Sequence, residues 1–281
     1  MTSLLATAVH FLILTQWLTQ QVTGRVQPAQ SCRLDMAEDA FDDQYVGCIK
    51  EMEAKAPQLL EEELKVNKNL SRDWKEAKIE WEKIKNKIDS SKRLSDFHGI
   101  ALVTYTGNIS TEFNKAVRNF RHNADKFQFK AFHYYLTRAL QLLTPEKKTC
   151  YTVYRGCKTT FDYSGKGHVR FGQFASSSLS KDVAKDFMGN FKGTLFTIKT
   201  CSGVKIKKFS FYPYEEEVLI PGYEEYQEVI KNNNDISLTE PKISKSNYNC
   251  FYINSSGMKE SSAFILLLPG LLALLLLPAE L

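Results

Sequence analysis

The first half of the chain has the hydrophobic spacing of amphipathic helices. Residues 51–93 are dense in Lys and Glu, and their large apolar residues recur at spacings of seven, three and four: Trp74, Trp81, Ile84 and Ile88. Side chains at these spacings lie on one face of a helix. We therefore predict an amphipathic helix whose apolar stripe belongs to the core rather than to a cofactor site.

A second helical pattern covers residues 127–143. Its apolar positions also share one face: Phe132, Leu136, Ala139, Leu140 and Leu143. The part of the chain before Pro145 is therefore predicted to be mainly helical.

From Cys150 onward the pattern changes to short runs rich in β-branched and aromatic residues, with Gly and Pro between them. Runs of this kind are typical of strands. They cover residues 150–154, 169–174, 193–199, 204–211 and 217–220. Helices followed by strands, without a βαβ alternation, predict an α+β fold rather than a doubly wound sheet. The sequence has no Gly-x-Gly-x-x-Gly and no Gly-x-x-x-x-Gly-Lys-Ser/Thr motif, so a Rossmann or P-loop site has no support.

The composition fits one domain between two apolar ends. We expect this domain over residues 25–252, with a helical part at 35–146 and a strand-rich part at 147–252. A hydrophobic content of 43% and an aromatic content of 12% are enough for its core. The formal net charge of +5 is small, and charges of both signs are interleaved, which argues against a nucleic-acid surface.

The N-terminal end indicates a cleaved signal peptide, residues 1–24. Its apolar stretch, residues 4–14, is too short to span a bilayer and is followed by small residues near Gly24. The alternative is a first buried helix, because no Lys or Arg precedes the apolar stretch.

The C-terminal end, residues 253–281, indicates a GPI-attachment signal whose tail is removed. Residues 263–277 are almost wholly apolar, are interrupted by Pro269, and are followed by no basic anchor. Small residues and a short polar spacer precede them, and Ser255 is the predicted attachment residue. A true tail anchor is the alternative.

Six cysteines in a chain routed for secretion indicate disulfides, and their spacings fit no metal site. From the residues alone, fifteen pairings are open if all six are bonded. Glycosylation sequons begin at Asn69, Asn108 and Asn254, and we expect the first two to be exposed and glycosylated. Such tripeptides also occur by chance.

Three short patterns in the strand-rich half carry candidate chemistry. Arg155 ends an apolar run, Ser176 opens a run of three serines, and an acidic run ends at Glu217. Taken singly, each has an ordinary explanation as a solvated ion-pair partner, a loop or a solvated face.

Together, these patterns resemble the arginine, serine and Glu-x-Glu signature of the arginine-specific mono-ADP-ribosyltransferases, which include cholera-type toxins and vertebrate GPI-anchored ecto-enzymes. Further segments resemble the ecto-enzymes, above all their T-cell type, so that the similarity extends over residues 35–252. These segments are residues 41–45, 131–137, 170–174 and 217–221. The resemblance implies a helical part packed on a β-sandwich-like core that holds an NAD cleft.

The resemblance also implies a role for each site residue. Arg155 would hold NAD, because a guanidinium fork suits a pyrophosphate. Glu217 would stabilise the positive charge that develops on the ribose when nicotinamide leaves. Ser176 would hydrogen-bond the ribose and this glutamate. Three further residues would line the NAD pocket: Tyr105, Gln173 and Ser210.

Glu215 lies two residues before Glu217, so both side chains would leave one face if the segment is extended. The family gives the first glutamate the task of orienting the acceptor arginine and taking its proton. Relatives with another residue there tend towards NAD hydrolysis.

The family pattern of four cysteines implies two disulfides, Cys48 with Cys250 and Cys150 with Cys201. Cys32 and Cys157 remain. Because Cys157 lies two residues after Arg155, a bond or a free thiol there could perturb NAD binding. The alternatives are an inert buried thiol and a third disulfide.

We therefore expect an enzyme on the extracellular face of the plasma membrane that transfers ADP-ribose from NAD to arginines of cell-surface or secreted proteins. NAD is its co-substrate, and no bound cofactor, metal or nucleic acid is expected. We expect it to be GPI-anchored and monomeric. The alternatives are an enzyme that is mainly an NAD glycohydrolase and an inert GPI-anchored recognition module.

Overall fold

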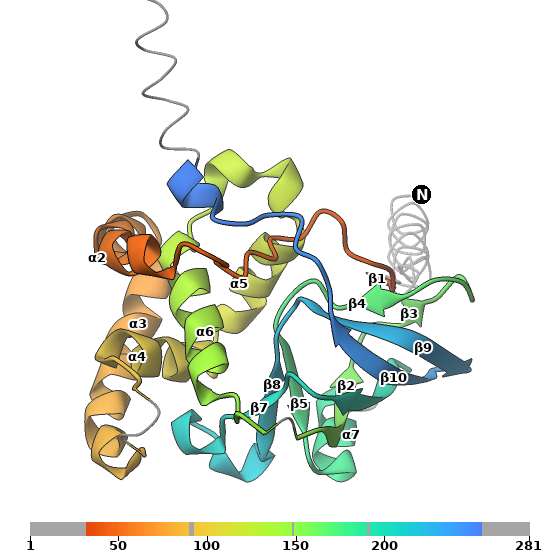
Figure 1. The fold of residues 1–281 in the computed structure, drawn as a ribbon. Helices are drawn as coiled ribbons and strands as arrows, with labels where there is room; N and C mark the ends of the chain where they lie inside the picture. Colours follow the sequence, from red (N-terminus) through yellow and green to blue (C-terminus); the bar gives the residue numbers. More distant parts are fainter. Residues whose placement is uncertain (1–31, 90–92, 148, 190–191, 255–281) are drawn as a thin grey trace, which may run out of the picture.

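The computed structural model describes residues 32–89, 93–147, 149–189 and 192–254. The predicted signal peptide, Ser255 and the apolar tail lie outside these residues. In Figure 1 a helical layer stands beside a sheet, in the order that the sequence predicted. No helix within the described ranges is long and apolar enough to cross a bilayer.

Five helices make the helical layer: α2 (Ile49–Val66), α3 (Lys68–Ile84), α4 (Asp96–Tyr105), α5 (Ile109–Arg118) and α6 (Lys130–Leu143). The single helix expected over residues 51–93 is therefore wrong, since two helices meet at Asn67. Asn67 has an extended backbone, and its side-chain oxygen accepts the N–H of Leu70, which caps the start of α3. Trp74 and Trp81 are buried as predicted.

Glu63 of α2 fixes the start of α6. Its buried carboxylate accepts the backbone N–H groups of Lys130, Ala131 and Phe132, which have no partner within their own helix. Burial raises the pKa of Glu63 to about 7, although these three hydrogen bonds oppose the shift. One side chain thus joins two helices and places the apolar face of α6 against the core.

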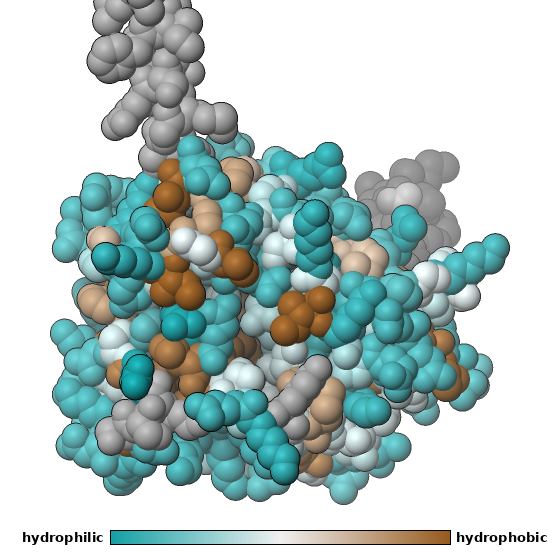
Figure 2. Space-filling view, in the orientation of Figure 1, coloured by the Kyte–Doolittle hydropathy of each residue, from teal (hydrophilic) through white to brown (hydrophobic). Residues whose placement is uncertain are grey.

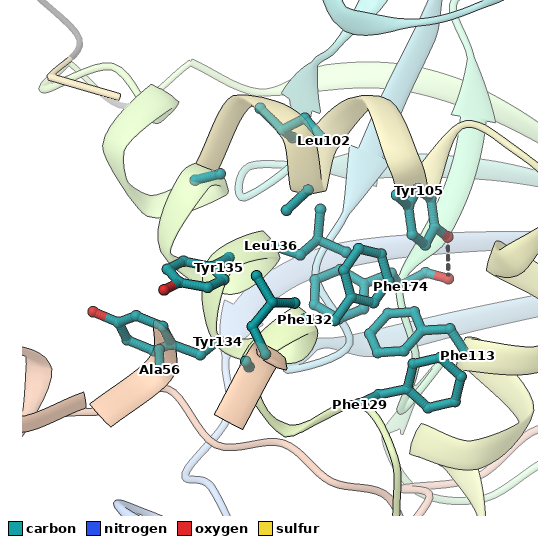
Figure 3. Packing of buried hydrophobic residues seen from close by; sticks show 14 of the residues in the cluster. Ala56, Leu102, Tyr105, Phe113, Phe129, Phe132, Tyr134, Tyr135, Leu136 and Phe174 are labelled. Atoms are coloured by element: carbon teal, nitrogen blue, oxygen red, sulfur yellow. Dashed lines mark hydrogen bonds between the residues drawn. The ribbon is translucent and has the colours of Figure 1, made fainter. Parts of the chain in front are cut away.

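An aromatic cluster joins the helical layer to the sheet (Figure 3). The ring of Phe113 lies 4.7 Å from that of Phe132 and 5.5 Å from that of Phe174, between centroids. Phe174 enters the sheet two residues before Ser176. The hydroxyl of Tyr105 donates to the backbone carbonyl of Phe174 at 3.1 Å, so the helical layer fixes the start of the strand Ala175–Ser178.

The main sheet has the strand order β4-β9-β10-β6-β2-β5-β8-β7. Its strands are β2 (Tyr151–Cys157), β4 (Val169–Arg170), β5 (Ala175–Ser178), β6 (Thr194–Thr200), β7 (Val204–Lys205), β8 (Glu217–Ile220), β9 (Glu224–Asn232) and β10 (Asp235–Ile243). The strands β1 (Cys32–Arg33) and β3 (Phe161–Asp162) pair in parallel and form a separate two-stranded sheet.

All five predicted runs contain a strand, although two of them, 169–174 and 204–211, hold only two strand residues each. The run 204–211 is a strand only at Val204–Lys205, because the chain then turns into a short 3-10 helix, Lys207–Phe209. The hairpin of β9 and β10 was not predicted, because its exposed half is rich in charged and polar residues and lacks an apolar run.

The sheet behaves as two sheets that face each other. Between β2 and β5 the ladder has a single pair, Tyr154 with Ser178, so these strands diverge. Apolar side chains from both halves then form one cluster, which includes Val153, Phe196, Ile198, Leu238, Ala175, Val218 and Ile220. This is the β-sandwich-like core that the resemblance implies, and the α+β prediction is confirmed.

Both predicted disulfides are present, Cys48–Cys250 and Cys150–Cys201. The first joins residues 202 positions apart and closes nearly the whole domain into one loop. The chain-entropy model gives such a loop about 5 kcal/mol of stabilisation.

A buried ion pair holds the start of the domain against the sheet. Arg170 of β4 donates to the Asp42 carboxylate at 2.6 Å, and both side chains are almost fully buried. Asp42 also accepts the backbone N–H groups of Asn247 and Tyr248 at 3.0 Å. Three distant segments therefore meet at one carboxylate.

We predict that Arg170→Met lowers the free energy of unfolding by about 3–5 kcal/mol, because it leaves a buried carboxylate without its cation. Urea denaturation measures the change. The matched control is Arg33→Met, whose partner Asp35 and own side chain are exposed, so that this pair contributes little. Equal, small effects of both substitutions would contradict the assignment.

Candidate active site

A pocket of about 490 Å³ opens where β2 and β5 diverge. Five of the seven predicted site residues line it: Arg155, Gln173, Ser176, Glu215 and Glu217. The structure therefore brings together the arginine, the serine and both glutamates, which are up to 62 positions apart in the sequence (Arg155 to Glu217, 217 minus 155).

Arg155 spans the gap between the two strands. It lies on the same face of β2 as the core residue Val153, and its Nη1 donates to the carbonyl of Ser176 at 2.5 Å. The next residue must be glycine, because a Cβ on Gly156 would come within 1.7 Å of the Ala184 carbonyl of α7 (Lys181–Met188). Helix and strand thus touch beside Arg155, which fixes the guanidinium at the pocket wall.

Ser176 lies opposite Arg155 and is held from the helical side. Its hydroxyl donates to the Tyr105 hydroxyl oxygen at 3.4 Å, and Asn114 donates to the same oxygen at 3.0 Å. Tyr105 is fully buried behind Ser176 and does not line the pocket, which differs from the prediction. Burial raises the pKa of Tyr105 to about 12, so it remains a neutral hydroxyl.

Glu217 is the first residue of β8, and 5% of its surface is exposed. Burial raises its pKa to about 7, and the negative charge of Glu215 adds to this. The hydrogen bond with Ser176 and the charge of Arg155 oppose the shift. The carboxyl group therefore titrates near neutral pH, which is common for carboxyl groups with a catalytic task.

Glu215 shares the pocket with Glu217, but not by strand alternation. It ends a 3-10 turn, Pro213–Glu215, and Glu216 follows in the left-handed region with φ 48° and ψ 45°. The condition of an extended segment is therefore not met. The tight turn at Glu216 brings its two neighbours to the same pocket, and burial raises the pKa of Glu215 as well.

Ser210 does not line the pocket. Its hydroxyl oxygen accepts the N–H of Tyr212 at 3.0 Å and so supports the turn that carries Glu215. Its contact with NAD stays a prediction.

Several pocket residues were not predicted as site residues, among them Cys32, Arg118, Cys157, Lys158 and Phe171. Arg118 comes from α5, and its fork donates to the carbonyls of Phe171 and Arg33. No local pattern marks an arginine at the end of a helix as a pocket residue. Cys32 and Cys157 are both free thiols at the pocket wall, so neither forms a third disulfide.

The pocket thus combines arginines with two carboxylates, one of them deeply buried. Among the residues that the structure describes, no group of three His, Cys, Asp or Glu side chains could hold a metal ion.

The comparisons with known proteins identify the family of the chain. The family model described as NAD:arginine ADP-ribosyltransferase matches residues 34–246. The chain is 56% identical over 272 residues to T-cell ecto-ADP-ribosyltransferase 2 of Rattus norvegicus, covering 95% of this chain and 96% of that protein. It is 37% identical over 259 residues to GPI-linked NAD(P)(+)--arginine ADP-ribosyltransferase 1 of Mus musculus, covering 84% and 78%.

A solved structure is also similar, the eukaryotic mono-ADP-ribosyltransferase ART2.2 as a mutant in complex with NAD. It is 57% identical, has a TM-score of 0.75, and covers 78% of this chain and 99% of that chain. The expected ADP-ribosyltransferase fold and the likeness to the T-cell ecto-enzymes are confirmed. The chain belongs to the NAD:arginine ADP-ribosyltransferase family.

Proposed function

We propose that this chain binds NAD in the pocket between β2 and β5 and transfers its ADP-ribose to arginine through Arg155, Ser176, Glu217 and Glu215. The observation that carries the proposal is that these four residues line one pocket. NAD:arginine ADP-ribosyl transfer is the activity of the family.

Arg155 would bind the pyrophosphate of NAD. One N–H group fixes its guanidinium on the Ser176 carbonyl, and the other donors of the fork can bind phosphate oxygens in a bidentate manner. Arg118, also at the pocket wall, adds a second positive charge. Gln173 would contribute a polar contact from the same wall.

Glu217 would act on the bond between nicotinamide and ribose. When this bond breaks, its electron pair leaves with nicotinamide and positive charge develops on the ribose carbon. An ionised carboxylate in a buried site stabilises that charge strongly. Ser176 positions the carboxylate, because it hydrogen-bonds Glu217 and is itself held by Tyr105.

Glu215 would serve the acceptor. A guanidinium nitrogen attacks the ribose carbon and loses a proton as the new bond forms, and Glu215 is placed to accept it. Two aromatic side chains beside it, Tyr212 and Tyr214, are exposed and would contact the incoming protein.

The same proposal includes an extracellular, GPI-anchored location, since relatives are named as ecto-enzymes and as GPI-linked. Residues 1–24 would be the signal peptide, 25–252 the domain and 253–281 the attachment signal, with the anchor at Ser255.

Asn69 and Asn108 are both exposed and accessible for glycosylation. The face shown in Figure 2 is mostly hydrophilic. We include a monomeric state in the proposal.

The test of the function is incubation with NAD, labelled in its adenine ring, and the arginine analogue agmatine. We expect labelled ADP-ribosyl-agmatine as the main product. Free ADP-ribose without this adduct would instead indicate an NAD glycohydrolase, and no turnover would indicate a recognition module.

We predict that Glu217→Gln lowers kcat by about 100- to 1000-fold, because it removes the charge that stabilises the transition state. Steady-state kinetics measure the change. Glu216→Gln is the matched control, since Glu216 is exposed and pairs with Lys207 at 2.9 Å. Full activity of the Glu217 variant would refute its role.

We predict that Glu215→Gln abolishes most transfer to agmatine but leaves NAD hydrolysis in place, because water needs less orientation than a guanidinium. The ratio of the two products measures this. A parallel loss of both products would show that Glu215 acts on NAD rather than on the acceptor.

We predict that kcat/KM for NAD rises with pH and levels off above about pH 7, the pKa of Glu217, because only its ionised form is active. Because the folded state holds the proton of Glu217 more tightly than the unfolded state, the free energy of unfolding falls as pH rises from 4.5 to about 7. Activity and stability therefore change in opposite directions.

Glu215→Gln removes a neighbouring negative charge and should move the pH midpoint of NAD hydrolysis to a lower value. An unchanged midpoint would contradict the coupling.

A further inference from the structure

A second depression, of about 760 Å³, lies on the helical layer. It is formed by α2, α4, α6 and Arg93 in the segment before α4, and Figure 1 shows α2 and α4 on the side of this layer that faces away from the strands. Ile49 and Leu142 give it apolar walls, and three cationic side chains line it: Lys50, Arg93 and Arg138. It shares no residue with the pocket between β2 and β5.

No carboxylate among the described residues pairs with these three cations. Within the described part of the chain none of them forms an ion pair, and Arg138 donates only to the Gln141 amide oxygen at 3.1 Å. Elsewhere on the helical layer, lysines pair with a glutamate one turn away, as Lys83 does with Glu80 at 2.8 Å. Three unpaired positive charges around one depression repel one another, and a bound anion would relieve this repulsion.

His98 supplies an unused donor in the same depression. The residue is 4% exposed, and its Nδ1 accepts the backbone N–H of Ser95 at 3.1 Å. Burial lowers the pKa of His98, so the ring is neutral and its proton lies on Nε2. Over the residues described here, this Nε2 has no hydrogen-bond partner, and an unsatisfied buried donor is costly.

One carboxylate, Glu53, also lines the depression. It accepts the hydroxyl of Tyr134 at 2.6 Å, and its other contact is distant, 3.9 Å from Nε2 of His98. One negative charge against three positive charges leaves the depression positive. Its polar groups are therefore mainly donors.

We propose that this depression, which we call the α2/α4/α6 site (Lys50, Arg93, His98 and Arg138), binds the oxyanion of a sulfate or phosphate group. A tetrahedral oxyanion has enough acceptor oxygens for two cationic side chains and the Nε2–H of His98 at once. The depression is open to solvent, so the group can be free or can be the terminal ester of a larger molecule.

The test is a titration of the purified protein with inorganic sulfate and, separately, phosphate, with chloride added to keep the ionic strength constant. The Hε1–Cε1 NMR signal of His98 is the readout. We expect a saturable shift with a Kd of about 1 mM, typical of a few charge-assisted contacts. No saturable shift would overturn the proposal.

Variants identify the site. Lys50→Gln and Arg138→Gln should each weaken binding about tenfold. Lys50 is exposed and Arg138 is half-buried, so urea denaturation of both variants checks that the fold is intact. The matched control is Lys78→Gln, a charge change on an exposed position of α3. Equal weakening by all three variants would show a general charge effect and overturn the proposal.

The source of the anion is decided by comparing a sulfated disaccharide with glucose 6-phosphate. Tighter binding of the disaccharide than of inorganic sulfate assigns the site to sulfated glycans. Tighter binding of glucose 6-phosphate than of inorganic phosphate assigns it to phosphate esters. The readout is independent of NAD turnover, so failure of the proposed function would leave this result standing.

Discussion

The hydrogen bond from Arg155 to the Ser176 carbonyl spans the point where the main sheet divides. β2 and β5 share a single ladder pair and then diverge, so their inner faces can pack as a sandwich while their edges leave a pocket. If the two strands paired along their full length, the sheet would be continuous, and Glu217 of β8 and Glu215 of the preceding turn would have no cavity to face. The guanidinium keeps the strands in register while they separate, and it remains available for a ligand.

The helical layer makes this arrangement rigid. Phe174 packs among its aromatic rings, and Tyr105 holds both the Phe174 carbonyl and the Ser176 hydroxyl. Ser176 in turn contacts Glu217, whose burial raises its pKa to about 7. The pKa of Glu217 therefore depends on the packing that buries it. Tyr105 and Ser210 lie behind the pocket wall, where their hydroxyl groups hold Ser176 and the turn that carries Glu215.

Periodicity was enough to predict the α+β class and the core faces of the helices, because burial imposes regular spacing on Trp74, Trp81 and the apolar face of α6. Periodicity failed where polar residues set a helix boundary or form most of a strand. Asn67 divides one expected helix by capping the next, and the charged hairpin of β9 and β10 has no continuous apolar run. The roles of Arg155, Ser176 and Glu217 came from resemblance, since each has an ordinary explanation alone. The left-handed backbone of Glu216 and the pocket position of Arg118 depend on tertiary contacts, which no local pattern encodes.

The central claim is that NAD lies across the division of the sheet, and the crystal structure of the Glu217→Gln variant with NAD tests it most directly. The account predicts the pyrophosphate on the Arg155 guanidinium, the nicotinamide ribose between Ser176 and residue 217, and the open side of that ribose towards Glu215. NAD bound outside this pocket, or bound with its nicotinamide ribose away from residue 217, would contradict the account.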